Sequence, residues 1–237
     1  MNPLATNVAP LPEVAVNFAL TWDGRIATRN RTRADFSSPR DKHRLLEIRA
    51  SGDALMVGRT TLETEQMLMG ISDETLRAER VQRGQPPYPL RVIVSGSGKI
   101  DPSSRIFGTT FAPIHIFTTA GMPEATRSAL EGKATLHVAE GSQVDLRAVL
   151  QTLRSSYGVQ RLICEGGPTL LRSMLEANLV DEINLTFCPR VFGGTDAPTL
   201  TGGPGDFLPA VECQLEAVEM IEGECFARYR VLKTTAS

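Results

Sequence analysis

Short apolar runs alternate with segments of helical spacing along most of the chain, and this alternation constrains the fold most. Strand-like runs lie at residues 14–20, 54–57, 90–94, 114–118, 135–138 and 162–164. Helical spacing marks residues 39–51, 123–130 and 144–157. Strands joined by helices run parallel, with helices on both faces of the sheet. The sequence therefore predicts an α/β protein with a mixed, mostly parallel central sheet flanked by helices.

The pattern changes toward the C-terminal end. Residues 181–191 and 211–232 have the composition of long strands with no helix between them, which predicts antiparallel strands there. The glycine- and proline-rich stretch 193–205 is expected to be a surface loop, and 63–89 either a long lid or a short helix with a loop. Because composition shows no sharp break, we expect one domain over residues 1–237, with its core at about 13–233.

Charge and composition exclude several classes of protein. The formal net charge is −2, whereas a general nucleic-acid binder would carry a basic excess. No run approaches the ~20 apolar residues that cross a bilayer, and no secretory signal is evident, so we expect a cytoplasmic protein without membrane contact. The cysteines form no Cys-x-x-Cys pair and the histidines lack metal-ligand spacing, which predicts buried reduced thiols and no metal site. The cysteines are Cys164, Cys188, Cys213 and Cys225.

Two glycines, Gly166 and Gly167, join a buried strand to a helix whose first turn suits Pro168 and Thr169. Free N–H groups and the helix dipole at such a start favour an anion, so the turn predicts a phosphate site. A carboxylate beside a phosphate would repel it, so Glu165 is expected to face another part of the ligand. A purely structural tight turn is the alternative interpretation of the glycines.

Three further loops, at 21–24, 58–61 and 95–99, leave strand ends, where open parallel sheets bind ligands. Gly58 precedes a guanidinium and two hydroxyls, which together suit a phosphate. A helix capped by a threonine, with a solvated arginine, is the structural alternative. Ser95 opens a loop that is expected to pack against an adenosine or to be only a flexible turn. The candidate cofactor residues here are Gly58, Arg59, Thr60, Thr61 and Ser95.

Six motifs occur in an order that is more specific than any one of them. They are Ala-Leu-Thr-Trp-Asp-Gly-Arg-Ile-Ala at 19–27, Ile-Arg-Ala at 48–50, Asp-Ala-Leu-Met-Val-Gly at 53–58, Glu-Gly-Gly-Pro-Thr at 165–169, Leu-Val-Asp-Glu at 179–182 and Pro-Arg-Val-Phe-Gly-Gly at 189–194. This series resembles the reductase domain of bacterial riboflavin biosynthesis, which has the dihydrofolate-reductase-like fold. The resemblance covers nearly the whole chain, and the deaminase domain often fused upstream is not expected.

The resemblance implies an NADPH-dependent oxidoreductase that opens the ribose of a phosphoribosylamino-pyrimidine to a ribityl chain. The substrate would be 5-amino-6-(5-phosphoribosylamino)uracil or the 2,5-diamino pyrimidinone analogue. In this family the Glu-Gly-Gly-Pro-Thr segment holds the cofactor pyrophosphate, which assigns Gly166, Gly167, Pro168 and Thr169 to that role. Arg59 is expected to meet a 2′-phosphate, which favours NADPH over NADH. The resemblance also implies a homodimer, for which the strand-rich end would supply an apolar surface.

The family glutamate that touches substrate matches Glu165. Thr21 and Asp23 match a loop between nicotinamide and substrate, where Trp22 replaces an aliphatic residue and is expected to pack on a ring of the cofactor. Asp23 and Glu165 are therefore the candidate catalytic residues, hydrogen-bonding the sugar or stabilising iminium charge. The alternative for Asp23 is that it only shapes an Asp-Gly turn.

The chain departs from the family at the substrate side. An Asp-Asn-Pro motif with a following arginine is replaced by Glu65-Gln66-Met67, so Glu65 is expected to stand in for the aspartate. Lys42 occupies the place of an arginine that faces substrate, a change in hydrogen-bonding geometry rather than charge.

Two other functions remain open at this point. One is a folate or pterin reductase, in which Asp41 would support protonation of the pteridine, although a salt bridge on the helix surface explains Asp41 more simply. The other is a nucleotide-binding protein that has lost its substrate side, since fold alone does not give function.

Overall fold

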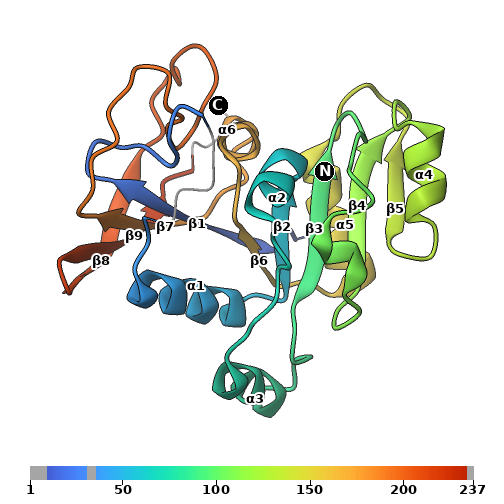
Figure 1. Ribbon diagram of the computed structural model, residues 1–237, viewed down its shortest axis with the longest axis horizontal. Helices are drawn as coiled ribbons and strands as arrows, with labels where there is room; N and C mark the ends of the chain where they lie inside the picture. Colours follow the sequence, from blue (N-terminus) through green and yellow to red (C-terminus); the bar gives the residue numbers. More distant parts are fainter. Residues whose placement is uncertain (1–9, 31–35, 234–237) are drawn as a thin grey trace, which may run out of the picture.

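The computed structural model describes residues 10–30 and 36–233, which form a nine-stranded sheet with helices on both faces (Figure 1). The strand order is β5-β4-β3-β2-β6-β1-β7-β9-β8. The strands are β1 Glu13–Thr21, β2 Ala54–Gly58, β3 Leu90–Ser95, β4 Ile114–Thr119, β5 Thr135–Ala139, β6 Arg161–Cys164, β7 Glu182–Cys188, β8 Cys213–Ile221 and β9 Glu224–Val231. The helices are α1 Pro39–Ser51, α2 Arg59–Glu65, α3 Glu74–Gln82, α4 Glu124–Leu130, α5 Leu146–Tyr157 and α6 Pro168–Glu176, with a 3₁₀ turn at Arg105–Gly108.

The directions of the strands confirm the predicted mixed sheet. All pairs from β5 across to β7 are parallel, whereas β9 is antiparallel to β7 and β8 is antiparallel to β9. The parallel pairs need crossover helices, and the last strands form a hairpin that needs none. The sequence pattern and the topology therefore agree on where the fold changes character.

Alternate residues of the central strands enter two separate cores, one on each face of the sheet. Val14 and Val16 of β1 pack in the core that α5 and α6 cover, with Leu153 and Met174 from those helices. Ala15 packs in the opposite core with apolar residues of α2 and α4. Side chains of a strand point alternately to its two faces, so a strand covered on both sides is apolar throughout. This explains why the runs that predicted the central strands are continuous.

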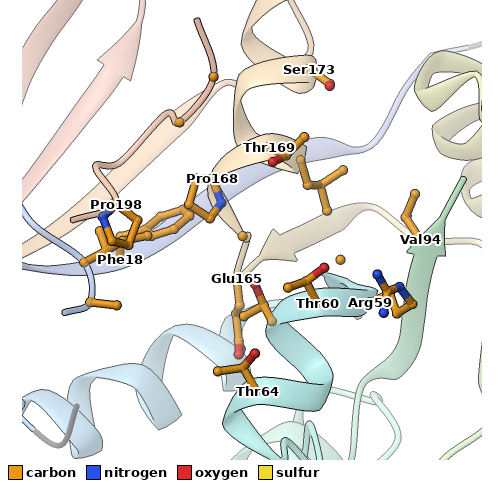
Figure 2. A pocket seen from close by; sticks show the side chains of 18 of the residues that line it. Phe18, Arg59, Thr60, Thr64, Val94, Glu165, Pro168, Thr169, Ser173 and Pro198 are labelled. Carbon is orange, nitrogen blue, oxygen red and sulfur yellow. The ribbon is translucent and has the colours of Figure 1, made fainter. Parts of the chain in front are cut away.

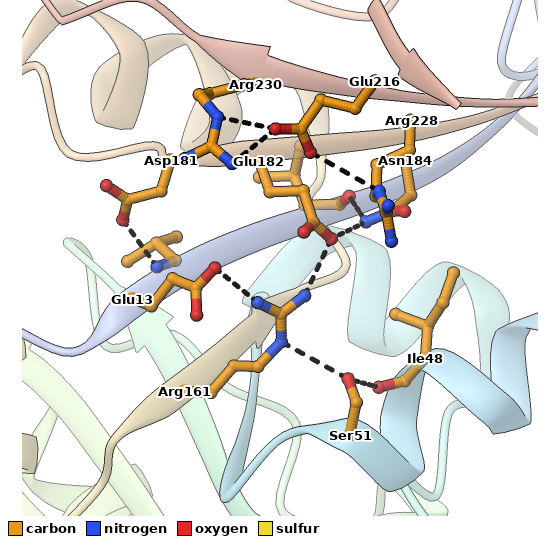
Figure 3. Close-up of polar contacts among 12 residues, drawn as sticks. Glu13, Ile48, Ser51, Arg161, Asp181, Glu182, Asn184, Glu216, Arg228 and Arg230 are labelled. Carbon is orange, nitrogen blue, oxygen red and sulfur yellow. Dashed lines mark hydrogen bonds and ion pairs between the residues drawn. The ribbon is translucent and has the colours of Figure 1, made fainter. Parts of the chain in front are cut away.

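A polar network ties together the N-terminal ends of three central strands (Figure 3). Nη1 of Arg161, on β6, lies 2.6 Å from Oε1 of Glu13 on β1. Its Nη2 lies 2.7 Å from Oε1 of Glu182 on β7. On the outer strands Nε of Arg230 donates to Glu216 at 2.6 Å. The Arg161 contacts lie at the opposite ends of β1, β6 and β7 from the loops that follow these strands, and they link the three strands there.

The segment that the sequence left open, 63–89, contains the end of α2 and the separate helix α3. Arg80 of α3 is fully buried and donates hydrogen bonds to the carbonyls of Ala50, Gly52 and Pro86. Figure 1 shows α3 beyond the end of α1, away from the loops that follow β2 and β6. A lid is therefore not formed by α3, which instead docks on α1 through a buried arginine.

The cysteines only partly match the expectation of buried thiols. Cys164 and Cys188 are buried, and burial raises the pKa of each thiol to about 12. Cys213 is exposed on the edge strand β8, and Cys225 is intermediate, so the expectation was wrong for Cys213. In the described part of the chain, no helix is long and apolar enough to cross a membrane.

Candidate active site

A cleft of about 1570 Å³ lies along the carboxyl ends of the parallel strands. The loops after β2, β3 and β6 all line it, as their shared position predicted (Figure 2). Its other wall is the loop at 195–203, which the sequence identified only as a surface loop. Arg25 holds that loop in place, because its Nη1 donates to the carbonyl of Ala197 at 2.8 Å and its backbone pairs with Thr199. The cleft is therefore assembled from segments far apart in sequence.

The two glycines after β6 are required by the packing of one strand-to-helix turn against another. Gly166 has a φ of +83°, and a Cβ there would collide with the ring of Phe18. A Cβ on Gly167 would collide with Oγ1 of Thr61, in the turn after β2. The turns are also joined by a hydrogen bond of 2.7 Å from Gly58 N to the Gly166 carbonyl. Neither glycine is explained by its own turn alone.

Helices α2 and α6 begin side by side at the cleft, and neither has a side-chain cap. Their N-caps are Gly58 and Gly167, and Pro168 occupies the first turn of α6. Thr60 and Thr61 lie inside α2, so the expectation that one of them caps this helix was wrong. Their side chains and that of Thr169 line the cleft instead. Two helix starts with hydroxyl groups beside them form a suitable environment for an anion.

Glu165 lines the cleft but is held from behind by Arg49 of α1. Nε and Nη2 of Arg49 each donate to a different oxygen of the carboxylate at 2.6 Å, and the Glu165 side chain is only 5% exposed. The same guanidinium donates to the Gly70 carbonyl at 2.9 Å. A bidentate pair of this kind fixes the direction of the carboxylate. Arg49 was not among the predicted site residues, since nothing in its local sequence indicates its partner.

The loop after β1 does not enter the cleft as expected. Asp23 accepts hydrogen bonds from the Thr21 hydroxyl and from the N–H groups of Phe192 and Gly193. Mainly because of the Thr21 hydroxyl, the pKa of Asp23 is lowered to about 2. Neither residue lines the cleft, and Trp22 is 74% exposed and also outside it. The residues of this loop that do reach the cleft are Arg25, Ile26 and Ala27.

The remaining predicted residues divide between the cleft and its surroundings. Arg59 lines the cleft, and its Nη1 forms an ion pair of 2.8 Å with Glu63 one turn along α2. Ser95 and Glu65 also line the cleft. Lys42 is exposed on α1 and does not line it.

Asp41 was predicted to be explained by a salt bridge on the helix surface, and this was wrong. It is 8% exposed and lines the cleft. Burial raises the pKa of its carboxyl group, and the charge of Glu224 on β9 adds to this effect. Among the acidic residues that line the cleft in the described ranges, only Asp41 and Glu165 are buried. The sequence signal was present, as Asp41 follows the Ser38 cap of α1, but only the packing shows that it faces inward.

The fold is that of the dihydrofolate-reductase-like class. The structure is similar to dihydrofolate reductase from Enterococcus faecalis, with a TM-score of 0.51 at 12% identity over 92% of this chain and 96% of that one. It is more similar to a pyrimidine reductase-like protein from Corynebacterium diphtheriae, with a TM-score of 0.82 at 21% identity over 94% and 93% of the two chains. Both likenesses concern the fold.

Sequence comparison narrows this class to one family. Residues 12–225 match the model of the RibD C-terminal domain. The chain is 34% identical to the 2,5-diamino-6-ribosylamino-4(3H)-pyrimidinone 5′-phosphate reductase of Archaeoglobus fulgidus, over 91% of this chain and 96% of that one. It is 32% identical to the enzyme of the same name from Methanothermobacter thermautotrophicus, over 93% and 98%. The chain belongs to the RibD C-terminal domain family, as its ordered motifs predicted.

Proposed function

We propose that this protein is an NADPH-dependent reductase of riboflavin biosynthesis that converts a phosphoribosylamino-pyrimidine to its ribitylamino product. The preferred substrate is the one named in the two archaeal relatives, 2,5-diamino-6-ribosylamino-4(3H)-pyrimidinone 5′-phosphate. The observation that carries the proposal is the cleft, which is lined by two adjacent helix starts and by two buried carboxyl groups, Asp41 and Glu165. This combination suits a phosphorylated cofactor beside a sugar substrate.

The glycine-lined turns support a dinucleotide cofactor. A Cβ at Gly166 would meet the ring of Phe18, and one at Gly167 would meet Oγ1 of Thr61, so this turn can present only its backbone to a ligand. Gly58, Gly166, Gly167, Pro168 and Thr169 would hold the pyrophosphate, with the hydroxyls of Thr60 and Thr61 beside it. Arg59 would meet the 2′-phosphate of NADPH, and Ser95 the adenosine end. Trp22 lies outside the cleft, so the geometry offers it no support as a cofactor contact.

The substrate would occupy the part of the cleft bordered by α1, α2 and Glu165. Glu165 is held in place by Arg49 and would stabilise positive charge at the reacting carbon or bind a sugar hydroxyl. Glu65 lines the same cleft and would contact substrate. Lys42 lies outside the lining and would act on the substrate only through longer-range charge. Asp23 and Thr21 would hold the segment at 190–193, leaving Glu165 to contact the reacting sugar.

The reaction requires an opened ribosylamine whose C1′ accepts a hydride, and bound NADPH would supply that hydride. The chain contributes position and charge. Phe18 and Pro168 line the cleft with apolar surface, and the carboxylate of Glu165 would stabilise the positive charge of an iminium formed when the ribose ring opens. No nucleophile from the protein is needed.

The direct test is NADPH oxidation with three substrates under the same conditions. We expect turnover with the diamino-pyrimidinone substrate or with the aminouracil analogue, and conversion of the ribosyl to a ribityl product by mass spectrometry. Turnover with neither pyrimidine would contradict the proposal. Reduction of dihydrofolate instead would support the second candidate, a pterin-type reductase, which is favoured by the buried Asp41 in the cleft.

A homodimer and a cytoplasmic location complete the proposal. Leu215, Val218 and Met220 of β8 are 52%, 55% and 69% exposed. A register shift between Leu215 and Ala217 keeps all three on one face, opposite Tyr229, Ala227 and Cys225 of β9. An exposed apolar strip on an edge strand is a suitable surface for pairing with a second copy. The unpaired cysteines and the need for NADPH favour the cytoplasm.

A further inference from the structure

A second carboxylate lies behind Asp41, and a serine connects the two residues. Ser38, the N-cap of α1, accepts a hydrogen bond of 3.0 Å from the backbone N–H of Asp41. The Ser38 hydroxyl donates to Oε2 of Glu224 at 2.5 Å. Glu224 opens β9 and is 3% exposed. The two acids thus come from elements at opposite ends of the sequence and share one buried corner of the cleft wall.

The groups around Asp41 act on its pKa in both directions, and the net effect is a raised pKa. Burial is the largest influence and raises the pKa, and the charge of Glu224 on β9 acts in the same direction. Hydrogen bonds from Thr186 of β7 and from Ser37, just before α1, lower the pKa, as does the charge of Lys42, which is the smallest of these influences. The buried thiol of Cys188 on β7 faces both acids.

The other candidate acids are unsuited to donating a proton. Both oxygens of Glu165 already accept hydrogen bonds from Arg49. Asp23 does not line the cleft and is held ionised by three donors. Asp41 is therefore the buried carboxyl group of the cleft that is best placed to donate a proton to the substrate.

We infer that Asp41 is the general acid that opens the ribose ring, with Glu224 and Ser38 as positioning residues; this rests on the proposed function. The Asp41 proton passes to the ring oxygen O4′ as the bond between C1′ and O4′ breaks. The electron pair of that bond stays on the oxygen, and the glycosidic nitrogen forms a C1′=N⁺ iminium. Hydride addition at C1′ completes the reduction, and the Asp41 carboxylate regains its proton from solvent. One proton is consumed for each NADPH oxidised.

Asp41→Asn removes the acid and preserves the shape of the side chain. With the cyclic substrate, we expect kcat to fall about 10²-fold or more, with little change in NADPH affinity by fluorescence titration. An analogue without the 4′-hydroxyl cannot close the ring, so both proteins should reduce it at similar rates. Loss of activity on both substrates would mean a structural role and would overturn the inference, as would full activity of Asp41→Asn on the cyclic substrate.

Ring opening also has a readout without the hydride step. In the absence of NADPH, the unchanged protein should accelerate exchange between the two C1′ anomers of the substrate, measured by NMR, and Asp41→Asn should not. Equal acceleration by both proteins would overturn the inference while leaving the proposed reductase intact. If the unchanged protein reduces no pyrimidine substrate, the proposed function fails and the role of Asp41 fails with it.

The pH profile separates the roles of the two acids. Activity that needs protonated Asp41 is present at low pH and lost as pH rises through its pKa. Glu224→Gln removes the neighbouring negative charge and so lowers the pKa of Asp41. The activity of this variant should therefore be lost at a lower pH than that of the unchanged protein. Glu47→Gln, on the same helix among Arg40, His43 and Arg44, is the matched control and should leave the profile unchanged. An unmoved profile in Glu224→Gln would contradict the positioning role.

Discussion

The guanidinium of Arg49 holds the carboxylate of Glu165 with two hydrogen bonds of 2.6 Å, although the residues lie 116 positions apart. Both side chains are nearly inaccessible to solvent, at 12% and 5% exposure. The pair joins α1 to the end of β6, so it links the wall of the cleft to the glycine turn. A buried pair of this kind is costly to break and inexpensive to replace as a unit.

Arg49→Met should therefore destabilise the protein by about 3–5 kcal/mol, because it leaves the Glu165 carboxylate buried without its partner. Urea unfolding at neutral pH measures this. The double variant Arg49→Met/Glu165→Met should recover most of the loss, since neither charge then remains. Strictly additive effects in the double variant would contradict the coupling.

Gly166→Ala should lower the free energy of unfolding more than the same substitution at another glycine with a left-handed backbone conformation. Gly84 has a φ of +77°, close to the +83° of Gly166, and a Cβ there meets open space. Gly84→Ala should cost about 1 kcal/mol from backbone strain alone. Gly166→Ala adds a collision with Phe18 and should cost about 2–4 kcal/mol in total. If urea unfolding gave the same loss of unfolding free energy for Gly166→Ala and Gly84→Ala, the contact with Phe18 would be irrelevant.

Gly167→Ala tests the contact between the two turns in a separate way. Its Cβ would meet Oγ1 of Thr61, which is a side-chain atom that can be removed. We expect Gly167→Ala to weaken NADPH binding, and Thr61→Ala/Gly167→Ala to recover part of that affinity in a fluorescence titration. Thr61→Ala alone is the control for the lost hydroxyl. A double variant no better than Gly167→Ala would refute the steric explanation.

Asp23→Asn should lower stability in a pH-dependent manner. The pKa of Asp23 is lowered from 3.8 to about 2, chiefly by the Thr21 hydroxyl. A group with a lowered pKa stabilises the fold above its unfolded value, and this contribution is lost as pH falls through the folded value. The difference in urea midpoint between the two proteins should be constant well above pH 3.8, shrink as pH falls from there, and vanish below pH 2. Asp206→Asn, in an exposed loop, is the control for the removal of one carboxylate.

Val218→Glu should convert the proposed dimer to monomers. The substitution places a charge in the middle of the exposed apolar strip on β8, where pairing would bury it. Light scattering should show the mass fall from two chains to one. Leu208→Glu is the control, because Leu208 is 91% exposed in the loop before β8. A monomeric unchanged protein, or a dimer that survives Val218→Glu, would count against this surface.

The central strands and their parallel arrangement followed from sequence because they depend on neighbouring residues. A strand covered on both faces is apolar at every position, and the spacing of 39–51 predicted α1 at its observed limits. The sequence left a lid and a short helix as alternatives over residues 63–89, because the anchor of α3 is Arg80, a residue type that favours the surface and is buried here by three carbonyls. The glycine turns were identified, but their partners were not.

The sequence by itself determined the fold class and the family and located the glycine turn at 165–169, because each is encoded in contiguous stretches of the chain. Only the tertiary structure decided which charged groups share the cleft. It placed Arg49 behind Glu165, brought Glu224 of the last strand to Asp41 of the first helix, and turned Asp23 toward the loop at 192–193. The physical reason is that the charge state of a carboxyl group depends on its burial and its neighbours, and here those neighbours come from distant parts of the chain.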